Sequence, residues 1–174
     1  IDGTRAFIEG NPTWAISLAI ADKGRITEAI VTLPMRGKTY AARLGKGARL
    51  NDLPIRTSAN ESLRQASILA ARPTFDAWNW KDASPPPIKP QLRPSLAYRL
   101  ALVGEGRFDA MLTLRATWEW DIAAGALIVR EAGGIASDRR LQPLRFNSPT
   151  AQVNGVLAAG RGLYRALGRR LSQS

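Results

Sequence analysis

The residues of this sequence that could carry chemistry begin with Asp121, in the stretch from Trp118 to Gly134. The spacing of small and apolar residues there predicts a helix that Thr117 caps and that the glycine pair at Gly133 ends. Asp121 falls in the first helical turn, where the helix dipole favours an ionised carboxylate. Acids are common at helix starts for structural reasons alone, so Asp121 by itself indicates no function.

A second carboxylate lies in the opening triplet Asp2-Gly3-Thr4. Gly3 lets the backbone approach a ligand closely, and the Thr4 hydroxyl stands beside N–H groups that suit phosphate oxygens. An Asp-Gly turn is common, and Thr4 could simply cap a short helix, so the triplet alone is weak. Together with the Asp121 segment it is a much stronger indication of function.

Two missing residue types narrow the chemistry further. The 174 residues contain no Cys and no His. Their absence excludes disulfides, thiolate zinc sites and cysteine nucleophiles, and it removes the commonest general base. Any metal must therefore be held by oxygen, which selects a hard cation such as Mg²⁺ or Mn²⁺.

Three motifs together resemble the inositol monophosphatase superfamily of magnesium-dependent, lithium-sensitive phosphatases. They are IDGT at residues 1–4, WDIAAG at 120–125 and EAGG at 131–134, and the segment GKGA at 45–48 is also similar. The resemblance implies a layered αβαβα sandwich, of which this α/β chain would form the latter two thirds, and a homodimer. It also implies an Asp-Pro pair before Ile1 and a metal-binding Glu further upstream, so we expect these residues to hold only part of the metal site.

The resemblance also implies a role for each candidate residue. Asp2 and Asp121 would bind one Mg²⁺ ion and the backbone carbonyl of Ile1 another, in a site of two or three ions that could also take Mn²⁺. Two such ions roughly 4 Å apart clamp the attacking water and the leaving oxygen of a phosphoryl transfer. Gly3 and Thr4 would give N–H groups to the phosphate, and the Thr4 hydroxyl would orient the water, so Asp2 and Thr4 are the catalytic candidates.

Neighbouring residues suggest the substrate. The continuation Arg5-Ala6-Phe7-Ile8 resembles the 3'(2'),5'-bisphosphate nucleotidase branch, which also carries a cation near position 99. Ser95, Arg99 and Arg115 are the substrate-binding candidates, and the two arginines could meet a second phosphate or be ordinary surface residues. We expect hydrolysis of 3'-phosphoadenosine 5'-phosphate to AMP and phosphate. The alternatives are an inositol-1-monophosphatase or other sugar phosphatase and, from another class, an inactive phosphatase-like or nucleic-acid-binding domain.

The charge balance is strongly basic, with a formal net charge of +11. This excess suits a small polyanionic substrate; the alternative is a solvated basic surface that serves solubility alone. The absence of a recognisable nucleic-acid-binding motif argues against a nucleic-acid partner. No apolar run approaches the ~20 residues of a membrane-spanning helix. We expect a small phosphorylated partner, no membrane, and a cytoplasmic location.

The pattern of elements predicts three regions. Residues 1–72 would end an N-terminal α+β subdomain as an antiparallel meander, with strands at 13–21, 26–33, 39–44 and 48–50, followed by a buried strand at 63–71. Residues 73–94 form a Pro-rich crossover loop in which Trp78 and Trp80 act as anchors. Residues 95–174 would form a C-terminal α/β subdomain, with helices at 95–105, 118–134 and 163–171 and strands at 108–114, 134–137 and 155–160.

Overall fold

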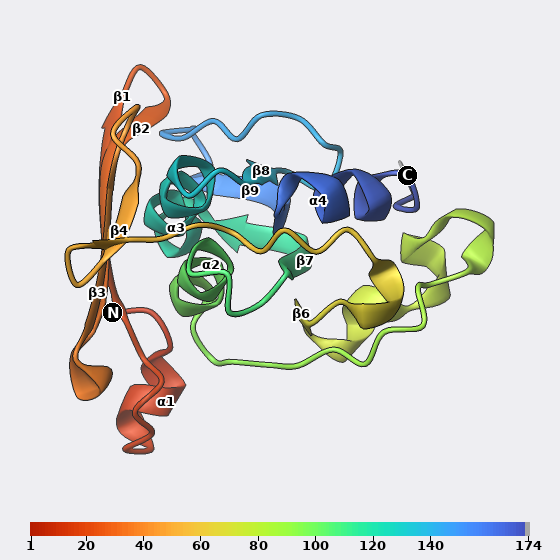
Figure 1. Ribbon diagram of the computed structural model, residues 1–174, viewed down its shortest axis with the longest axis horizontal. Helices are drawn as coiled ribbons and strands as arrows, with labels where there is room; N and C mark the ends of the chain where they lie inside the picture. Colours follow the sequence, from red (N-terminus) through yellow and green to blue (C-terminus); the bar gives the residue numbers. More distant parts are fainter. Residues whose placement is uncertain (173–174) are drawn as a thin grey trace.

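The computed structural model describes residues 1–172, which form two β-sheets with helices between and beside them (Figure 1). The first sheet contains five antiparallel strands in chain order: β1 (Ile16–Asp22), β2 (Arg25–Leu33), β3 (Lys38–Arg43), β4 (Ala48–Leu50) and β5 (Leu53–Pro54). Tight turns join neighbouring strands, because residues such as Lys23 and Asn51 adopt the positive φ that such hairpins require. The predicted meander is confirmed, with β5 as an addition.

The second sheet has four strands in the order β6-β7-β9-β8, with only β6 parallel to its neighbour. They are β6 (Ile68–Leu69), β7 (Ala110–Trp118), β8 (Ile135–Ser137) and β9 (Gln152–Ala159). The predicted strand at 63–71 is wrong for most of its length, because residues 63–65 form a 3₁₀ turn and only two residues pair. The predicted end of β7 at 114 is also wrong, because pairing resumes beyond a bulge and continues to Trp118.

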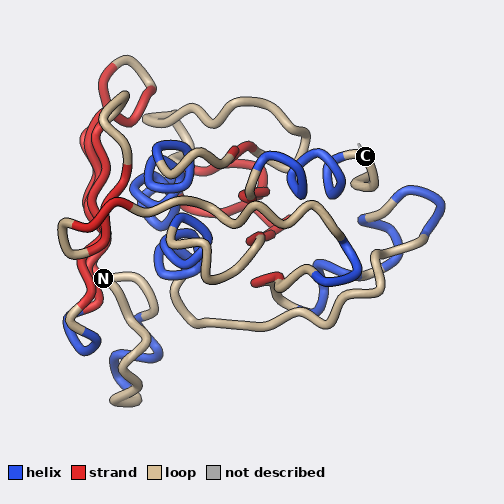
Figure 2. Tube along the Cα trace, in the orientation of Figure 1, coloured by secondary structure: helices blue, strands red, loops and turns tan. Residues whose placement is uncertain are grey.

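Four α-helices complete the layers: α1 (Thr4–Ile8), α2 (Leu96–Gly104), α3 (Glu119–Glu131) and α4 (Arg161–Gly168). Helices α2 and α3 lie side by side between the two sheets, and α4 packs against the second sheet (Figures 1 and 2). Alternate residues of β7 and β9 face opposite sides of the second sheet. Met111 therefore packs in the core that contains α2 and α3, and Leu112 packs in the core that contains α4. The layered α+β fold is confirmed.

The segment between β6 and α2 contains three short 3₁₀ turns, η3 (Arg72–Phe75), η4 (Ala77–Asn79) and η5 (Lys81–Ala83). Two further 3₁₀ turns occur earlier in the chain, η1 (Pro34–Arg36) and η2 (Leu63–Gln65). Trp80 is buried, stacks on Phe75 and donates its indole N–H to the carbonyl of Thr74, so its predicted anchoring role is confirmed. The same prediction for Trp78 is wrong, because its side chain is 73% exposed.

Because β6 precedes the crossover loop but pairs with β7 beyond it, the second sheet draws on both predicted subdomains. The division into residues 1–72, 73–94 and 95–174 stays a prediction. None of the helices formed by residues 1–172 is long and apolar enough to cross a bilayer.

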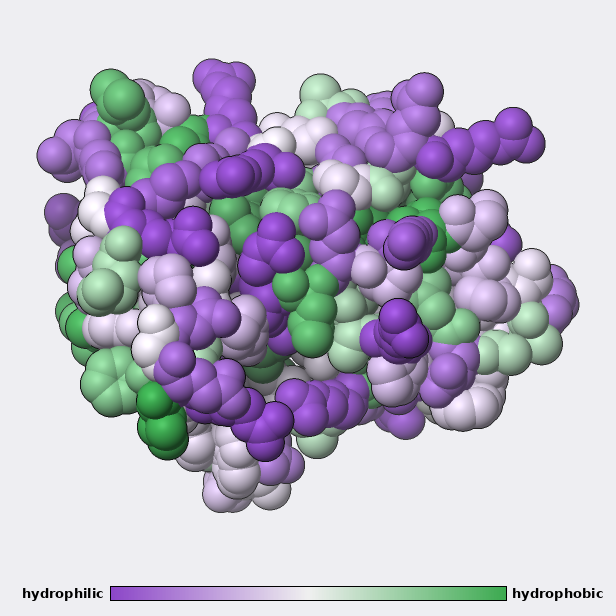
Figure 3. Space-filling view, turned by 90° about the horizontal axis from the view of Figure 1, so that it is seen from below, coloured by the Kyte–Doolittle hydropathy of each residue, from purple (hydrophilic) through white to green (hydrophobic). Residues whose placement is uncertain are grey.

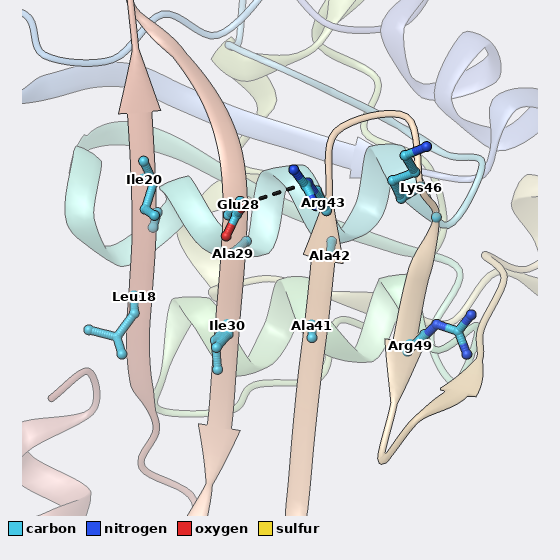
Figure 4. A pocket seen from close by; sticks show the side chains of 12 residues that line it. Leu18, Ile20, Glu28, Ala29, Ile30, Ala41, Ala42, Arg43, Lys46 and Arg49 are labelled. Atoms are coloured by element: carbon cyan, nitrogen blue, oxygen red, sulfur yellow. Dashed lines mark ion pairs between the residues drawn. The ribbon is translucent and has the colours of Figure 1, made fainter.

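The two faces of the five-stranded sheet differ. One face packs on α2 and α3, and the other carries Leu18, Ile20 and Ile30, which are 59%, 58% and 42% exposed (Figure 4). These residues line a shallow hollow of about 600 Å³ that also includes the exposed Glu28–Arg43 ion pair. Hydrophobic residues, coloured green, reach the surface at the left edge of Figure 3. Neither Asp2 nor Asp121 lines this hollow.

Helices α2 and α3 meet at Gly125, where a side chain would not fit. A Cβ atom built on Gly125 would lie 2.4 Å from Leu100 Cβ and 2.8 Å from its Cδ1. Leu100 is fully buried, so it has no free space to move into. The absence of a side chain at Gly125 therefore sets how closely the two helices approach.

We predict that G125A destabilises the protein although alanine ordinarily favours a helix. The added methyl group overpacks the α2–α3 contact, which should lower the free energy of unfolding by about 1–3 kcal/mol. G162A in α4 is the matched control, because the three atoms nearest to its Cβ all belong to the exposed, flexible side chain of Glu61. Urea unfolding of the three proteins checks this, and equal stabilities for G125A and G162A would contradict it.

Candidate active site

Asp2 is held in place by its backbone and by its side chain. Its N–H donates to the carbonyl of Ala15 at 2.8 Å and its carbonyl accepts from the Ala15 N–H at 2.9 Å, next to the start of β1. Its carboxylate oxygen Oδ2 accepts from Ser95 Oγ at 2.6 Å and from the Ala97 N–H at 2.8 Å. The carboxylate thus lies at the N-terminus of α2, where the helix dipole favours negative charge.

Ser95, a predicted substrate contact, is fully buried. Its hydroxyl donates to Asp2 and accepts from the Tyr98 N–H at 3.0 Å, which makes Ser95 the N-cap of α2. Both functions of the hydroxyl are used within the protein, so the structure gives Ser95 a role in positioning Asp2.

The glycine of the opening triplet packs on this helix start. Gly3 has φ 85°, and a Cβ atom there would lie 3.3 Å from Trp14 Cα and 3.4 Å from Ser95 Cβ, so an L side chain would be both strained and crowded. Gly3 occupies the N-cap position of α1, so the alternative that Thr4 caps a short helix is wrong, because Thr4 is the first helical residue. Thr4 and Ile1 are both exposed beside Asp2.

Asp121 lies in the first turn of α3, as predicted. The predicted cap at Thr117 is wrong, because β7 extends to Trp118, which takes the N-cap position, and the Thr117 hydroxyl donates to the Arg115 carbonyl at 3.3 Å. The predicted end of the helix is confirmed: the Gly133 N–H donates to the carbonyl of Arg130 at 3.0 Å.

The other two acids of α3 are fully engaged in structural bonds. Glu119 accepts from the Asn147 N–H at 2.6 Å and from the Ser148 N–H and hydroxyl at 3.0 and 2.6 Å. Glu131 accepts from the Gly45 and Gly47 N–H groups at 3.0 and 2.9 Å, which fastens the β3–β4 turn to the end of α3. Glu131 belongs to the EAGG motif and Glu119 directly precedes the WDIAAG motif, but the sequence gave no sign of these partners. Asp121, in contrast, accepts no hydrogen bond from any residue of the described chain.

Asp2 and Asp121 lie close enough to repel each other. Burial and the Asp2 carboxylate raise the pKa of Asp121 from 3.8 to about 6, although the terminal amino group and Arg115 act in the opposite direction. Two neighbouring carboxylates are a charge arrangement that favours a cation between them. Their oxygens suit Mg²⁺ in type. Within residues 1–172, no cluster of three or more acidic, His or Cys side chains suited to a metal occurs, so this chain contributes two carboxylates.

The two predicted arginines join the same neighbourhood. Arg99 is only 8% exposed, and its guanidinium donates to the carbonyls of Arg93 and Pro94. Burial lowers the pKa of Arg99 to about 10, while Asp2 raises it and Arg115 lowers it further. Arg99 therefore lies near both Asp2 and Arg115, and its buried position shows that it is not an ordinary surface arginine.

Arg99 and Arg115, which interact electrostatically with the two acids, also line a pocket of about 500 Å³. Its walls come from the loop at 71–79, helix α2 and strand β7, and they include Trp78, Arg99, Thr113, Leu114, Arg115 and Arg139. Nothing in the sequence distinguished Arg139 from the many other cations. Its approach to this pocket depends on the pairing of β7 with β9, which sequence spacing did not reveal.

Comparison with known proteins identifies the family of this chain. A family model described as "Inositol monophosphatase family" matches residues 1–173. The chain belongs to this family. A "Putative Nus factor SuhB" of Neisseria meningitidis is 40% identical over 146 residues, and "Nus factor SuhB" of Escherichia coli K12 is 36% identical over 146 residues.

Solved structures show the same fold. Inositol monophosphatase-II from Staphylococcus aureus superposes with a TM-score of 0.83 at 26% identity, over 97% of this chain and 65% of that one. An IMPase from Thermotoga maritima gives a TM-score of 0.77 at 30% identity, over 96% of this chain and 63% of that one. The matches to the Neisseria and E. coli relatives cover 79% of this chain and 55% and 54% of theirs, so this family member spans about half the length of its curated relatives.

We predict that D121N stabilises the metal-free protein at neutral pH. The folded protein holds the Asp121 proton up to about pH 6, whereas the unfolded chain releases it near 3.8. Stability therefore falls as pH rises through this window and stays lower above it. After allowance for solvent screening, the gain at pH 7.5 should be about 1–2 kcal/mol.

Unfolding in EDTA at pH 4 and pH 7.5 checks this prediction. The two proteins should have similar stabilities at pH 4 and differ at pH 7.5. Excess Mg²⁺ should then stabilise the wild type more than D121N, because the amide is a poorer ligand for a hard cation. The same stability difference between the two proteins at both pH values would show that the carboxylates do not interact.

Proposed function

We propose that this protein is a divalent-metal-dependent phosphomonoesterase whose site is built on Asp2 and Asp121. The observation that carries the proposal is the approach of these two carboxylates, one of which has a raised pKa and no hydrogen-bond donor among the described residues. Family membership supports the same chemistry. A bound Mg²⁺ ion would polarise the phosphoryl group and lower the pKa of the attacking water.

The residues of this chain have separate roles in that proposal. Asp2 and Asp121 would hold one cation, and the backbone carbonyl of Ile1 would be a ligand of another. Ser95 and the Ala97 N–H fix the Asp2 carboxylate, so its ligand oxygen is positioned before the cation binds. The N–H groups of Gly3 and Thr4 would bind the phosphate, and the Thr4 hydroxyl would orient the attacking water.

For the substrate we propose a 3'(2'),5'-bisphosphate nucleotide, hydrolysed to the monophosphate and phosphate. The arginines beside the acids support this choice, because an inositol monophosphate has no second phosphate for them to bind. The S. aureus enzyme has been crystallised with inositol monophosphate and with 2'AMP, so inositol or another sugar phosphate is the alternative. The homodimer and the cytoplasmic location stay predictions.

A second candidate function follows from the names of the relatives. Several are called Nus factors, and a net charge of +11 would suit contact with a nucleic acid or a transcription complex. In that case the chain could act as a binding domain with or without catalysis. RNA affinity that falls steeply with salt would support this alternative.

The expected result for the first proposal is Mg²⁺-dependent phosphate release by the complete gene product that carries these 174 residues. Adenosine 3',5'-bisphosphate should be hydrolysed with a higher kcat/KM than inositol 1-phosphate. D121N should lose at least about 100-fold, because an electrostatic group at the reacting centre is removed. Full activity in D121N would refute the assigned site, and a preference for inositol phosphate would refute the nucleotide assignment.

A further inference from the structure

We propose that the pocket beside Asp2 and Asp121 is a second phosphate site, in which Arg115 and Arg139 bind a phosphate of the substrate other than the one that is hydrolysed. Arg139 is the new residue in this assignment. The inference rests on the proposed function for its biological meaning, and it goes further by naming the residues that select a doubly phosphorylated substrate.

A bulge in β7 creates this part of the pocket. Pairing with β9 runs through Thr113 and Val156 and resumes at Ala116 and Asn154, so Leu114 and Arg115 together face one residue, Gly155. Gly155 has φ 71°, and a Cβ atom there would lie 2.6 Å from the Thr113 carbonyl oxygen and 3.2 Å from Arg139 Cβ. Bulges re-aim side chains and are common beside active sites.

The bulge also fixes Arg139. The Arg139 backbone N–H donates to the Asn154 carbonyl at 2.9 Å, and its Nη1 donates to the Leu114 carbonyl at 2.9 Å. A guanidinium has five N–H donors, and this bond uses one. Arg139 is therefore held in place while most of its donors remain available to a ligand.

The neighbouring acid does not neutralise Arg139. The Asp138 carboxylate accepts from the N–H groups of Arg140 and Gln142 at 2.9 and 2.7 Å, which forms the tight turn after β8. Arg115 is exposed and donates no hydrogen bond to any residue from 1 to 172. The two ion pairs of the described residues, Lys38–Glu105 and Arg43–Glu28, lie elsewhere.

The charge balance of the pocket therefore favours an anion. Three arginines line it against one carboxylate, that of Asp76. Arg99 lies at the back, uses two of its nitrogens on backbone carbonyls and supports the positive potential without needing to contact the ligand. Phosphate suits the remaining arginines because a guanidinium binds two of its oxygens at once.

The position and size of the pocket restrict the ligand. Arg99 lies one helical turn after Ser95, whose hydroxyl donates to Asp2, so an anion bound in the pocket lies beside the part of α2 that holds Asp2. The exposed indole of Trp78 forms part of the wall. A volume of about 500 Å³ accommodates a nucleoside-sized group. The ligand class is thus a phosphate monoester with a second phosphate on the same small molecule.

The first test measures binding without catalysis. In EDTA and 150 mM salt, calorimetric titration with AMP should show R139M and R115M weakened by at least about tenfold, because each loses a charged hydrogen bond. R140M is the matched control, since Arg140 is the exposed neighbour and does not line the pocket. R115M keeps the test decisive even if R139M misfolds, because the Arg115 side chain donates no hydrogen bond within residues 1–172 and its removal breaks none.

The second test uses the complete gene product with Mg²⁺. R139M should raise KM for adenosine 3',5'-bisphosphate about tenfold and leave KM for inositol 1-phosphate unchanged. If R139M, R115M and R140M weaken AMP binding equally, the pocket is refuted, because the overall positive charge of the protein would then account for the binding. Selective loss of AMP binding without any hydrolysis would instead uphold the pocket and refute the proposed function.

Discussion

The repulsion between the Asp2 and Asp121 carboxylates is the interaction that the surrounding structure must overcome. Two hydrogen bonds at the start of α2 hold Asp2, and its backbone pairs with Ala15. Asp121 has no such donor among the described residues and is fixed only by its place in α3. Together with burial, the repulsion that these contacts do not offset raises the pKa of Asp121. A site of this kind is less stable when empty, and a divalent cation would relieve that cost.

The closeness of the two acids is set by the packing of α2 against α3. Asp2 is attached to the first turn of α2 through Ser95 and Ala97, and Asp121 belongs to the first turn of α3. The separation of the helices depends in turn on Gly125, which leaves no room for a side chain against Leu100. Two motifs that are distant in the sequence therefore act together through one helix contact. The glutamates of α3 fasten the same helix to the β3–β4 turn and to the loop at 147–148.

The sequence predicted the features that depend on local patterns or on a motif. The meander, the helix that carries Asp121 and the end of that helix at Gly133 all follow from periodicity and turn residues. The helix caps were predicted less well: Thr117 pairs in β7 because tertiary strand pairing overrides its capping preference. The strand at 63–71 failed for a related reason, since Ile68, Leu69 and Ala70 are buried by packing while only Ile68 and Leu69 pair with β7. The spacing of apolar residues indicates which residues are buried, but by itself it does not show whether the backbone there is a strand, a helix or a turn.

The basic pocket shows what the sequence could not reveal. Net charge indicated an anionic partner but gave no location, because 25 lysines and arginines are spread along the chain. Arg115 and Arg139 become neighbours only because β7 bulges opposite Gly155, and a bulge depends on the register between two strands. The same bulge leaves the Leu114 carbonyl free to hold the Arg139 guanidinium. Most of the lysines and arginines therefore need not contact a ligand, because the register between β7 and β9 brings only a few arginines together in the pocket.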